Sequence, residues 1–364
     1  MIRVAVINTG WWADAMYLPA LKAHSQVEVS AVCGRNAERA AAFAAKWDVP
    51  HAFTNLDEML AQQVCDAVIV ASHTNYHHDQ TIACLNAGLH VLCEKPMATS
   101  VAEADEMASL AKAKGRKTMI PFTYRFMAHN RYMKQLIDDG FIGDPYHLNI
   151  RYYHDFGRNP GYGWGWNKDV VGAGDLANLG SNPIYLAYLY FGAVESVTAE
   201  INQTIDRGLV DPQGQPFTPA DDNGLITLRF KNGAMGSIHY TSLSYETTSA
   251  FKQQHYYDFH GSNGTLYHKN NWYDVQETIG ATVGEELRVL EIPADVWGNG
   301  NIPGNVHESY KTVFRQDGHM VGEFIDAIIN DGEPSPNFED GLMVQKIIAA
   351  AELSSQEGRR ISLK

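Results

Sequence analysis

The first 122 residues alternate short β-rich runs with helix-compatible segments, and this alternation restricts the fold more than any other feature. The β-rich runs are residues 2–7, 27–33, 67–71, 90–93 and 118–122. The segments with helical patterns are residues 12–24, 35–47, 56–62, 79–87 and 101–114. Parallel strands need crossover connections to return the chain to the same edge of the sheet. The pattern therefore predicts an α/β domain of the Rossmann type, with a doubly wound parallel sheet.

The pattern changes after Pro121, because later β-rich runs follow one another with few helices between them. We expect strands at residues 146–153, 196–203, 224–230, 234–243, 256–260 and 286–292. Helices are expected at residues 131–139, 176–191, 319–330 and 339–357. This order predicts a second, α+β domain with a large, mostly antiparallel open sheet. A chain of 364 residues accommodates both domains, which we place at residues 1–122 and 123–364.

Composition and charge exclude several classes of protein. The chain has 28 Lys and Arg residues against 42 Asp and Glu residues, and its net charge of -14 disfavours nucleic acid as a partner. No stretch approaches 18 consecutive apolar residues, so no membrane partner is expected. The four cysteines form no CxxC pair, and the N-terminus runs directly into a strand pattern. We expect reduced cysteines, no metal site and a cytoplasmic protein.

The turn after the first β-rich run has part of the pattern of a dinucleotide-binding loop. It reads Asn-Thr-Gly-Trp-Trp-Ala from Asn8 to Ala13 and keeps Gly10 as the second glycine of G-x-G-x-x-G/A. Asn8 replaces the first glycine, and asparagine tolerates a left-handed backbone better than most residues. Trp11 and Trp12 either cover the pyrophosphate or pack against the fold. An ordinary βα turn is the alternative to a nucleotide site.

The end of the second β-rich run bears on the choice between NAD and NADP. An acidic residue normally binds the ribose hydroxyls of NAD at this position. Here the chain has Gly34 and Arg35, which leave room for a 2′-phosphate and supply a cation. Arg35 could instead stack on adenine and leave NAD usable. The sequence favours NADP without excluding NAD.

A lysine follows the strand expected at residues 90–93. The segment Glu94-Lys95-Pro96 places this lysine at the carboxyl end of a parallel strand, where such sheets bind ligands. A surface ion pair between Glu94 and Lys95 is the alternative interpretation.

Several segments in the same order resemble the Gfo/Idh/MocA oxidoreductase family, the glucose-fructose oxidoreductase and inositol dehydrogenase group. Glu94-Lys95-Pro96 after Ala-Gly-Leu-His-Val at residues 87–91 is similar to the family's E-K-P segment. Ala-Ser-His-Thr-Asn-Tyr-His at residues 71–77 is similar to its A-T-P-N-x-x-H loop, although His73 replaces proline. Further similarities are Tyr124-Arg125-Phe126, residues 136–143 and Glu339-Asp340-Gly341. The resemblance implies NAD or NADP as cofactor and a small-molecule carbohydrate as substrate.

The resemblance also implies roles for particular residues. The cofactor would be lined by the residues of the first turn together with Ser72, His73, Asn75, His77, Glu94 and Pro96. The substrate would be contacted by Tyr124 and Arg125. Lys95 would contact the reacting hydroxyl and the nicotinamide ribose. In the family a D-x-G-x-H helix supplies a carboxylate and a base, but here Asn178 and Asn182 stand at those positions. Neutral amides cannot accept a proton at neutral pH, so we expect them only to bind substrate.

Another group must then take the proton. Lys95 is the first candidate, because lysines lose protons more readily when burial or a nearby cation lowers their pKa. Asp175 lies three residues before Asn178, and His154 ends an expected strand. A helix N-cap is the alternative role for Asp175, and a structural role is the alternative for His154.

The glycine-rich aromatic loop at residues 157–174 contains Trp166 and Lys168, both of which suit a sugar site. Indole rings pack on the C–H faces of sugars, and a lysine binds hydroxyls or an acidic substituent. The alternative for the tryptophans is packing between domains.

These features lead to one principal hypothesis and two rivals. We expect a nicotinamide-dependent oxidoreductase that acts on a secondary hydroxyl of a sugar, glycoside or cyclitol. A redox-neutral, NAD-dependent glycosidase that works by transient oxidation and elimination is the first rival. A non-catalytic sugar or nucleotide sensor is the second. The broad second-domain sheet further suggests a homodimer or homotetramer, which the resemblance also implies.

Overall fold

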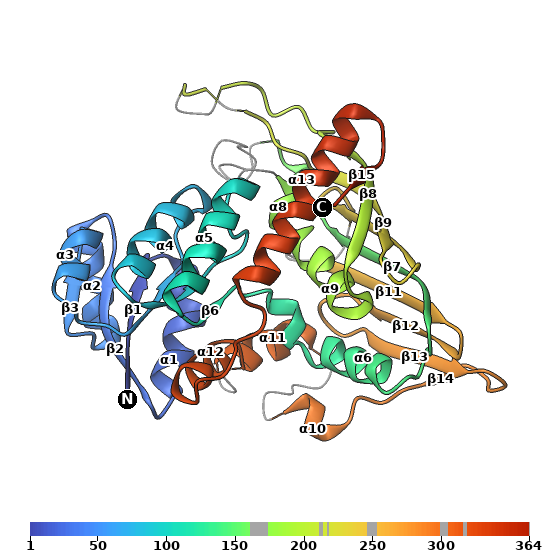
Figure 1. The fold of residues 1–364 in the computed structure, drawn as a ribbon, viewed down its shortest axis with the longest axis horizontal. Helices are drawn as coiled ribbons and strands as arrows, with labels where there is room; N and C mark the ends of the chain where they lie inside the picture. The colour runs from blue at the N-terminus through green and yellow to red at the C-terminus, as the bar shows by residue number, and fades with distance from the viewer. Residues whose placement is uncertain are drawn as a thin grey trace. The chain divides into compact units, whose positions relative to one another are not determined.

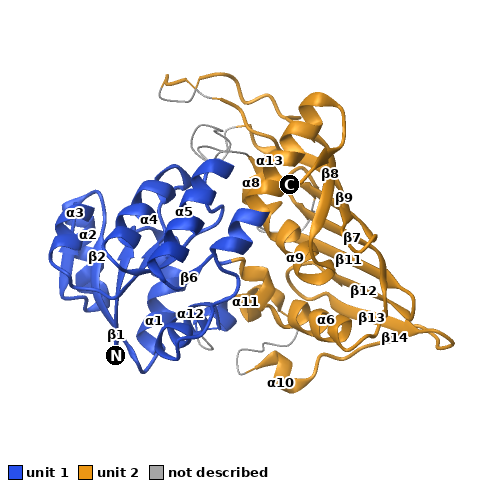
Figure 2. Ribbon diagram, viewed as in Figure 1, with its two compact units in different colours: residues 1–121, 311–343 blue, residues 122–310, 344–364 orange. Residues whose placement is uncertain are grey.

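The computed structural model describes residues 1–160, 174–210, 214–216, 218–245, 253–298, 305–315 and 319–363. The chain forms two compact units, which Figure 2 shows in different colours. Unit 1 contains residues 1–121 and 311–343, and unit 2 contains residues 122–310 and 344–364. Residues 311–343 belong to the second domain predicted from the sequence, and in this structure they group with unit 1. There the amide of Ile120 donates to the carbonyl of Pro336 at 3.0 Å.

Unit 1 is a six-stranded parallel sheet with strand order β3-β2-β1-β4-β5-β6 (Figure 1). Its strands are β1 Ile2–Ile7, β2 Val27–Cys33, β3 His51–Phe53, β4 Ala67–Val70, β5 His90–Cys93 and β6 Thr118–Met119. This is the strand order of dinucleotide-binding folds, in which the connections diverge on either side of the β1–β4 pair. The expected doubly wound fold is therefore confirmed.

Helices connect these strands. They are the π-helix η1 Ala13–Tyr17, α1 Leu18–Ala23, α2 Ala37–Trp47, α3 Leu56–Ala61, η2 Thr74–Tyr76, α4 His77–Asn86 and α5 Val101–Lys114. Side chains cap three of them, because Asn36, Asn55 and Ser100 each accept a hydrogen bond from the amide three residues later. All residues of β4 are fully buried, which accounts for the apolar runs in the sequence. Unit 1 also includes α12 His319–Ile329 and the start of α13 Phe338–Glu357.

Unit 2 is built on a nine-stranded sheet with order β14-β13-β12-β11-β7-β10-β9-β8-β15. Its strands are β7 Pro145–His154, β8 Val194–Asn202, β9 Asn223–Phe230, β10 Met235–Thr241, β11 Gln253–Gly261, β12 Gly264–Asn270, β13 Gln276–Thr282, β14 Arg288–Val289 and β15 Ile361–Ser362. Within this second sheet, the β7–β10 pair is the only parallel one among the strand pairs of the described residues. The expected open, mostly antiparallel sheet is therefore confirmed.

The helical elements of unit 2 include η3 Thr123–Phe126, α6 Ala128–Asp138, η4 Phe156–Arg158, α8 Asp175–Asn178, α9 Ser181–Phe191 and α10 Ala294–Trp297. Helix α11 Val306–Arg315 and helix α13 each span a division between the units. The single helix expected over residues 176–191 is interrupted between α8 and α9. A Cβ atom at Gly180 would lie 2.5 Å from the carbonyl oxygen of Leu176, so glycine permits this close approach. Strands β12 and β13 were missed by the sequence analysis.

No helix among the described residues is both long enough and apolar enough to cross a membrane.

Candidate functional site

The turn after β1 lies at the carboxyl edge of the sheet of unit 1 and is fixed by Asn8. This residue has φ 102°, the left-handed conformation that the sequence led us to expect. Its side-chain amide donates to the carbonyl oxygen of Ala71 at the end of β4, and its Oδ1 accepts from the amide of Gly10 at 2.9 Å. Asn8 thus does more than replace a glycine, because it joins the two strands between which this fold binds ligands.

The end of β2 carries no acidic residue. A Cβ atom at Gly34 would lie 2.9 Å from the side chain of Thr9, so a larger residue there would displace the first turn. Arg35 is exposed, and its guanidinium lies 5.6 Å from the ring centroid of Tyr76 in η2. The two side chains therefore form a cation–π pair beside the same sheet edge.

The loop after β4 contains the four residues suggested by the resemblance. Asn75 is exposed, whereas Ser72 and His73 are half-buried. His77 is fully buried, with one ring nitrogen 2.9 Å from the carbonyl oxygen of Pro96 and the other 3.0 Å from that of Ser72. This geometry gives His77 a positioning role, since it ties the β4 loop to the β5 loop.

Glu94 is a buried carboxylate that gathers donors from three directions. Its Oε1 accepts hydrogen bonds from the indole N–H of Trp12 and from the hydroxyl of Tyr17, and its Oε2 accepts from the amide of Lys95. Burial raises the pKa of Glu94 above its ordinary value, although these donors and the Lys95 charge oppose the shift. Trp12 therefore contacts the lysine segment, whereas Trp11 is 67% exposed.

Lys95 follows β5 and is half-buried. Burial lowers the pKa of its ammonium group, and the charge of Glu94 acts in the opposite direction. Pro96, which follows it, accepts the hydrogen bond to His77. The lysine thus stands beside a buried acid at the carboxyl edge of a parallel sheet, where its proton is easier to lose than in water.

His154 ends β7 in unit 2 and is fully buried. Neither ring nitrogen has a hydrogen-bond partner. The ring stacks on Phe156, with 3.6 Å between the ring centroids, and burial lowers its pKa well below the ordinary value. His154 is therefore neutral at neutral pH and has nitrogens that can still form hydrogen bonds.

A polar aromatic network lies next to His154. Gln253 is its register partner on β11, and Gln253 Oε1 accepts from the hydroxyls of Tyr124 and Tyr152 at 3.0 and 2.9 Å. His255 Nε2 lies 3.2 Å from the same oxygen. The hydroxyls of Tyr124 and Tyr152 also contact each other. Tyr124, expected at the substrate site, is thus part of a network that reaches the end of β7.

Asp175 is the first residue of α8, and it does not cap that helix. Asp221 does so, because its two carboxylate oxygens accept from the amides of Gly174 and Leu176 at 2.8 and 2.7 Å. Neither oxygen of Asp175 forms a hydrogen bond of good geometry, although the nearby Ser242 side chain lowers the pKa of the carboxyl, and the residue is 1% exposed. Burial, followed by the charge of Asp221, raises the pKa of Asp175 well above its ordinary value. A buried carboxyl with a raised pKa binds a proton more strongly than an ordinary aspartate and is a candidate for proton transfer.

The remaining substrate candidates lie on α8, α9 and η3 of unit 2 or outside the described residues. Asn182 is buried with Oδ1 unpartnered, as is the hydroxyl of neighbouring Ser181. Asn178 is half-buried on α8, and Arg125 donates to the hydroxyl of Tyr185 at 2.9 Å. Trp166 and Lys168 lie outside the described residues. Among the described residues, no group of three or more His, Cys, Asp or Glu side chains is placed to hold a metal ion.

Comparison with known families assigns both parts of the chain. Residues 2–122 match the Gfo/Idh/MocA model described as an oxidoreductase family with an NAD-binding Rossmann fold. Residues 134–363 match the family's C-terminal alpha/beta domain. The chain belongs to the Gfo/Idh/MocA oxidoreductase family. It is thus an oxidoreductase with a domain for NAD or NADP, and the resemblance seen in the sequence is confirmed.

Two named relatives match all of this chain or more than half of it. D-glucoside 3-dehydrogenase of Escherichia coli is 26% identical over 100% of this chain and 97% of its own length. The scyllo-inositol 2-dehydrogenase (NADP(+)) of Bacillus subtilis is 35% identical over 55% of this chain and 61% of its own. A levoglucosan dehydrogenase solved with NADH and levoglucosan has a TM-score of 0.86 at 23% identity, covering 99% of both chains. The similarity to the levoglucosan dehydrogenase structure supports the two-domain fold described above.

The residues of unit 1 fit the cofactor of the Gfo/Idh/MocA family. The left-handed Asn8 leaves the turn tight at Gly10, and no side chain extends from Gly34 into the edge where the ribose would bind. Arg35 supplies a cation there. These groups can hold either NAD or NADP.

Several residues of this site were not among the candidates predicted from the sequence. Tyr152 lies two residues before His154, so strand periodicity alone places both on one face. Gln253 and His255 emerge only from the register of β7 with β11, which the sequence did not reveal. Asp221 lacks any local motif, because it caps a helix 45 residues earlier in the chain.

Proposed function

We propose that this chain catalyses the nicotinamide-dependent oxidation of a secondary hydroxyl on a sugar, glycoside or cyclitol, or the reverse reduction. The observation that carries this proposal is a set of buried polar atoms on β7, α8 and α9 of unit 2 that form no hydrogen bond of good geometry. They are both nitrogens of His154, both oxygens of Asp175, Ser181 Oγ and Asn182 Oδ1. Buried polar atoms normally have partners, so these fit a ligand rich in hydroxyls. The named sugar and cyclitol dehydrogenases among the relatives support this class of substrate.

Each catalytic residue has a distinct proposed role. The chemistry that a bound nicotinamide would supply here is acceptance of a hydride from the carbinol carbon. Lys95 donates a hydrogen bond to the reacting hydroxyl and stabilises the negative charge that develops on its oxygen. Asp175 accepts the hydroxyl proton, and Asn178 and Asn182 orient the substrate.

The protonation properties favour Asp175 over His154 as the base. The lowered pKa of His154 means that a proton transferred to its ring is held weakly. The raised pKa of Asp175 means that its carboxylate holds a proton more strongly than an ordinary aspartate does. We therefore assign His154 to hydrogen bonding with substrate and Asp175 to proton transfer.

Two rival functions have weaker support. A redox-neutral glycosidase would use the same cofactor and lysine, but the named relatives described above are dehydrogenases. A sensor would need neither the buried carboxyl of Asp175 in unit 2 nor the half-buried Lys95 in unit 1. Neither rival accounts better for the site.

The test uses the purified protein with a panel of sugars, cyclitols and aryl glycosides under limiting NAD or NADP. We expect one reduced cofactor per oxidised substrate and no release of aglycone. Lys95→Ala should abolish turnover and retain cofactor binding, whereas Lys112→Ala, on the exposed side of α5, should behave as wild type. Many aglycones released per cofactor would overturn the proposal in favour of the glycosidase, and a complete lack of hydride transfer would favour the sensor.

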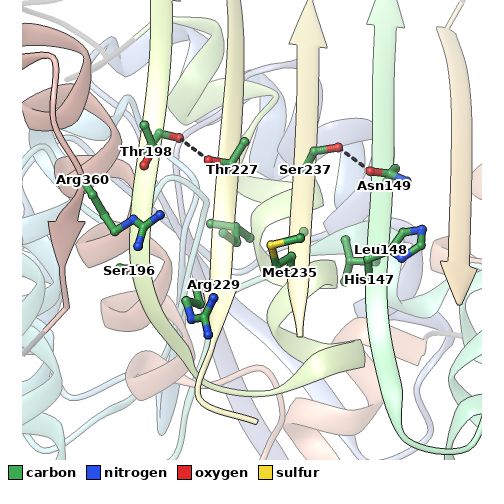
Figure 3. Close-up of a pocket in the computed structure, with 12 residues that line it drawn as sticks. His147, Leu148, Asn149, Ser196, Thr198, Thr227, Arg229, Met235, Ser237 and Arg360 are labelled. Carbon is green, nitrogen blue, oxygen red and sulfur yellow. Dashed lines mark hydrogen bonds between the residues drawn. The ribbon is translucent and has the colours of Figure 1, made fainter. Parts of the chain in front are cut away.

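We also propose that the protein forms a homodimer or homotetramer through the open face of the unit 2 sheet. This face has a depression of about 440 Å³ between β7, β10, β9 and β8 (Figure 3). Met235 and Leu225 on the same strands are 59% and 46% exposed. Exposed apolar side chains on a broad sheet favour pairing with a second copy. Sedimentation of only a monomer at micromolar concentration would overturn this assignment.

A further inference from the structure

A side-chain amide lies beside His154 at the end of the unit 2 sheet. Gln253 begins β11 and is the register partner of His154, which ends β7. Directly opposed residues on antiparallel strands point their side chains to the same face of the sheet. Gln253 therefore stands next to the buried ring of His154, whose two nitrogens have no hydrogen-bond partner.

The carbonyl end of this amide is fixed by neighbouring side chains. Gln253 Oε1 accepts from the hydroxyls of Tyr124 and Tyr152 at 3.0 and 2.9 Å, and His255 Nε2 lies 3.2 Å from the same oxygen. An amide oxygen has two lone pairs, which the two tyrosine hydroxyls can satisfy. Tyr124 is buried and packs edge-on against the rings of Tyr152 and His255. With Oε1 held in this way, the planar amide directs its two N–H groups away from the tyrosines.

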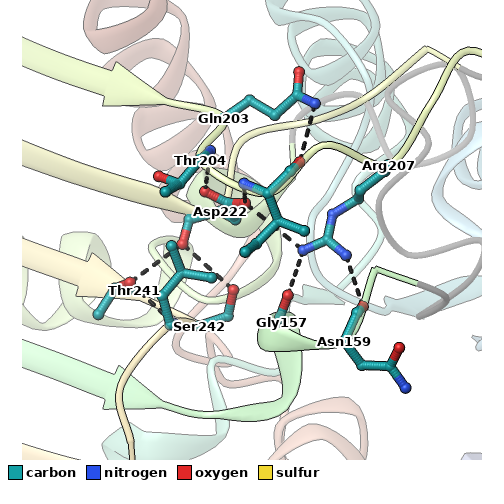
Figure 4. Close-up of polar contacts among 10 residues, drawn as sticks. Gly157, Asn159, Gln203, Thr204, Arg207, Asp222, Thr241 and Ser242 are labelled. Atoms are coloured by element: carbon teal, nitrogen blue, oxygen red, sulfur yellow. Dashed lines mark hydrogen bonds and ion pairs between the residues drawn. The ribbon is translucent and has the colours of Figure 1, made fainter.

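His154 is held from the side of the chain that follows β7. Its ring stacks on Phe156, with 3.6 Å between the ring centroids. Arg207 fixes the next residues by donating to the carbonyl oxygens of Gly157 and Asn159 at 2.5 and 3.0 Å (Figure 4). The side chain of Arg207 is only 1% exposed. His154 and Gln253 are thus both supported by packing and hydrogen bonds that need no ligand, as a selective binding site requires.

We propose that Gln253 is a specificity-determining residue whose amide N–H groups donate to one substrate hydroxyl, while His154 bonds the hydroxyl on the adjacent carbon. This role rests on the proposed function, because it takes a sugar, glycoside or cyclitol as the ligand of this part of unit 2. Adjacent hydroxyls on such a ring suit two polar side chains that stand opposite each other on neighbouring strands. A hydrogen bond made equally in the ground state and the transition state affects KM more than kcat, so Gln253 acts on the choice of substrate.

The first test removes the amide and measures binding, so it does not depend on turnover. Isothermal titration calorimetry with NADH present gives the dissociation constants of methyl β-D-glucopyranoside and of its monodeoxy analogues. The wild-type protein should bind the parent glucoside about tenfold more tightly than the analogue that lacks the hydroxyl bound by Gln253. Gln253→Met keeps the length of the side chain and should reduce this ratio to no more than about twofold, with the ratios for the other analogues unchanged.

A second variant tests the direction of the hydrogen bond and provides for misfolding of the first. Gln253→Glu keeps an oxygen for the hydroxyls of Tyr124 and Tyr152 but replaces the N–H donors with an acceptor. Fluorine on carbon can accept a hydrogen bond and cannot donate one. Replacing the bound hydroxyl with fluorine should therefore weaken binding at least about fivefold more in Gln253→Glu than in the wild-type protein.

Gln254→Glu is the matched control, because the same substitution is made one residue further along β11. Successive side chains of a strand point to opposite faces of the sheet. Gln254 Oε1 accepts from the hydroxyl of Tyr256 at 2.6 Å, a contact that glutamate can keep. This variant should leave every ratio at its wild-type value.

Turnover measurements separate this role from the proposed function. Both Gln253 variants should raise KM at least about fivefold and change kcat less than about twofold. If the binding ratios change as expected but no hydride transfer occurs with any panel member, the proposed function is overturned and the contact stands. If hydride transfer occurs while the ratios in the Gln253 variants stay at wild-type values, only the role of Gln253 is overturned. An equal loss of affinity for all the compounds, or no binding of any of them, would also overturn it.

Discussion

The indole N–H of Trp12 donates a hydrogen bond to the buried carboxylate of Glu94, joining the first turn of unit 1 to the residue that precedes Lys95. Tyr17 reaches the same oxygen from five residues further along the chain. The π-helix at Ala13–Tyr17 starts between them, and its wider turn brings residues five apart close to one face. The π-helix thus allows the side chains of Trp12 and Tyr17 to donate to the same carboxylate oxygen of Glu94.

Replacing Trp12 with Phe should destabilise the protein through Glu94. The ring is kept, but a buried carboxylate loses a donor, which costs about 1.5–3 kcal/mol. Because the folded-state pKa of Glu94 is already raised, stability falls as pH rises from about 4.5 through that pKa. The loss should therefore be larger at pH 8 than at pH 4.5 in urea unfolding. Trp11→Phe, at the exposed neighbour, should leave the free energy of unfolding unchanged; equal effects of the two variants would contradict this explanation.

Arg35 should distinguish the two cofactors. Arg35→Ser removes the cation at the end of β2, so we expect the KM for NADP to rise about tenfold while the KM for NAD changes less than about twofold. The cation–π contact with Tyr76 is lost with either cofactor and cannot produce this difference. Arg39→Ser, at an exposed position on α2, is the control. A wild-type protein that clearly prefers NAD would show that this arginine does not bind a 2′-phosphate.

The base can be tested by moving it. Asp175→Asn should lower kcat by about 10²–10⁴-fold, since general base catalysis contributes that much. Introducing Asn182→His into that variant restores a titratable group at the position where the family has its histidine. We expect at least about tenfold recovery in kcat, measured against Asn182→His alone. The absence of recovery, together with a small effect of Asp175→Asn, would place the base elsewhere.

Buried histidines should make the protein sensitive to acid. Burial lowers the pKa of His129 to about 3, and His154, His255 and His268 are also shifted far down. Between pH 6.5 and about 3 the unfolded chain binds a proton that folded His129 does not, so stability falls as pH falls. His129→Phe preserves a ring against His268 and should reduce the slope of unfolding free energy by about 1.4 kcal/mol per pH unit.

The control for this experiment is His51→Phe, which removes an exposed histidine from β3. Unfolding free energies from urea titrations at several pH values give the slopes. A wild-type slope in His129→Phe would show that the ring is protonated in the folded protein.

The sequence predicted the elements whose signals are local. The apolar runs of β1 and β4 are strands buried on both faces, and the left-handed Asn8 follows from the turn chemistry of asparagine. The short strands β12 and β13 were missed, because half-buried strands in an open sheet mix polar and apolar residues. Asp175 was a candidate base in the sequence, but its alternative role as N-cap could be rejected only when Asp221 was seen to cap α8.

The sequence by itself determined the parallel sheet, the turn at Asn8 and Gly10, and the place of Lys95 after β5. These depend on hydrophobic periodicity and on the backbone preferences of single residues, which act over a few positions. Only the tertiary structure decided that Trp12 bonds Glu94 and that Asp175 is buried without a hydrogen bond of good geometry. Such properties depend on burial and on contacts between segments that are distant in the sequence, and both arise only when each unit has folded.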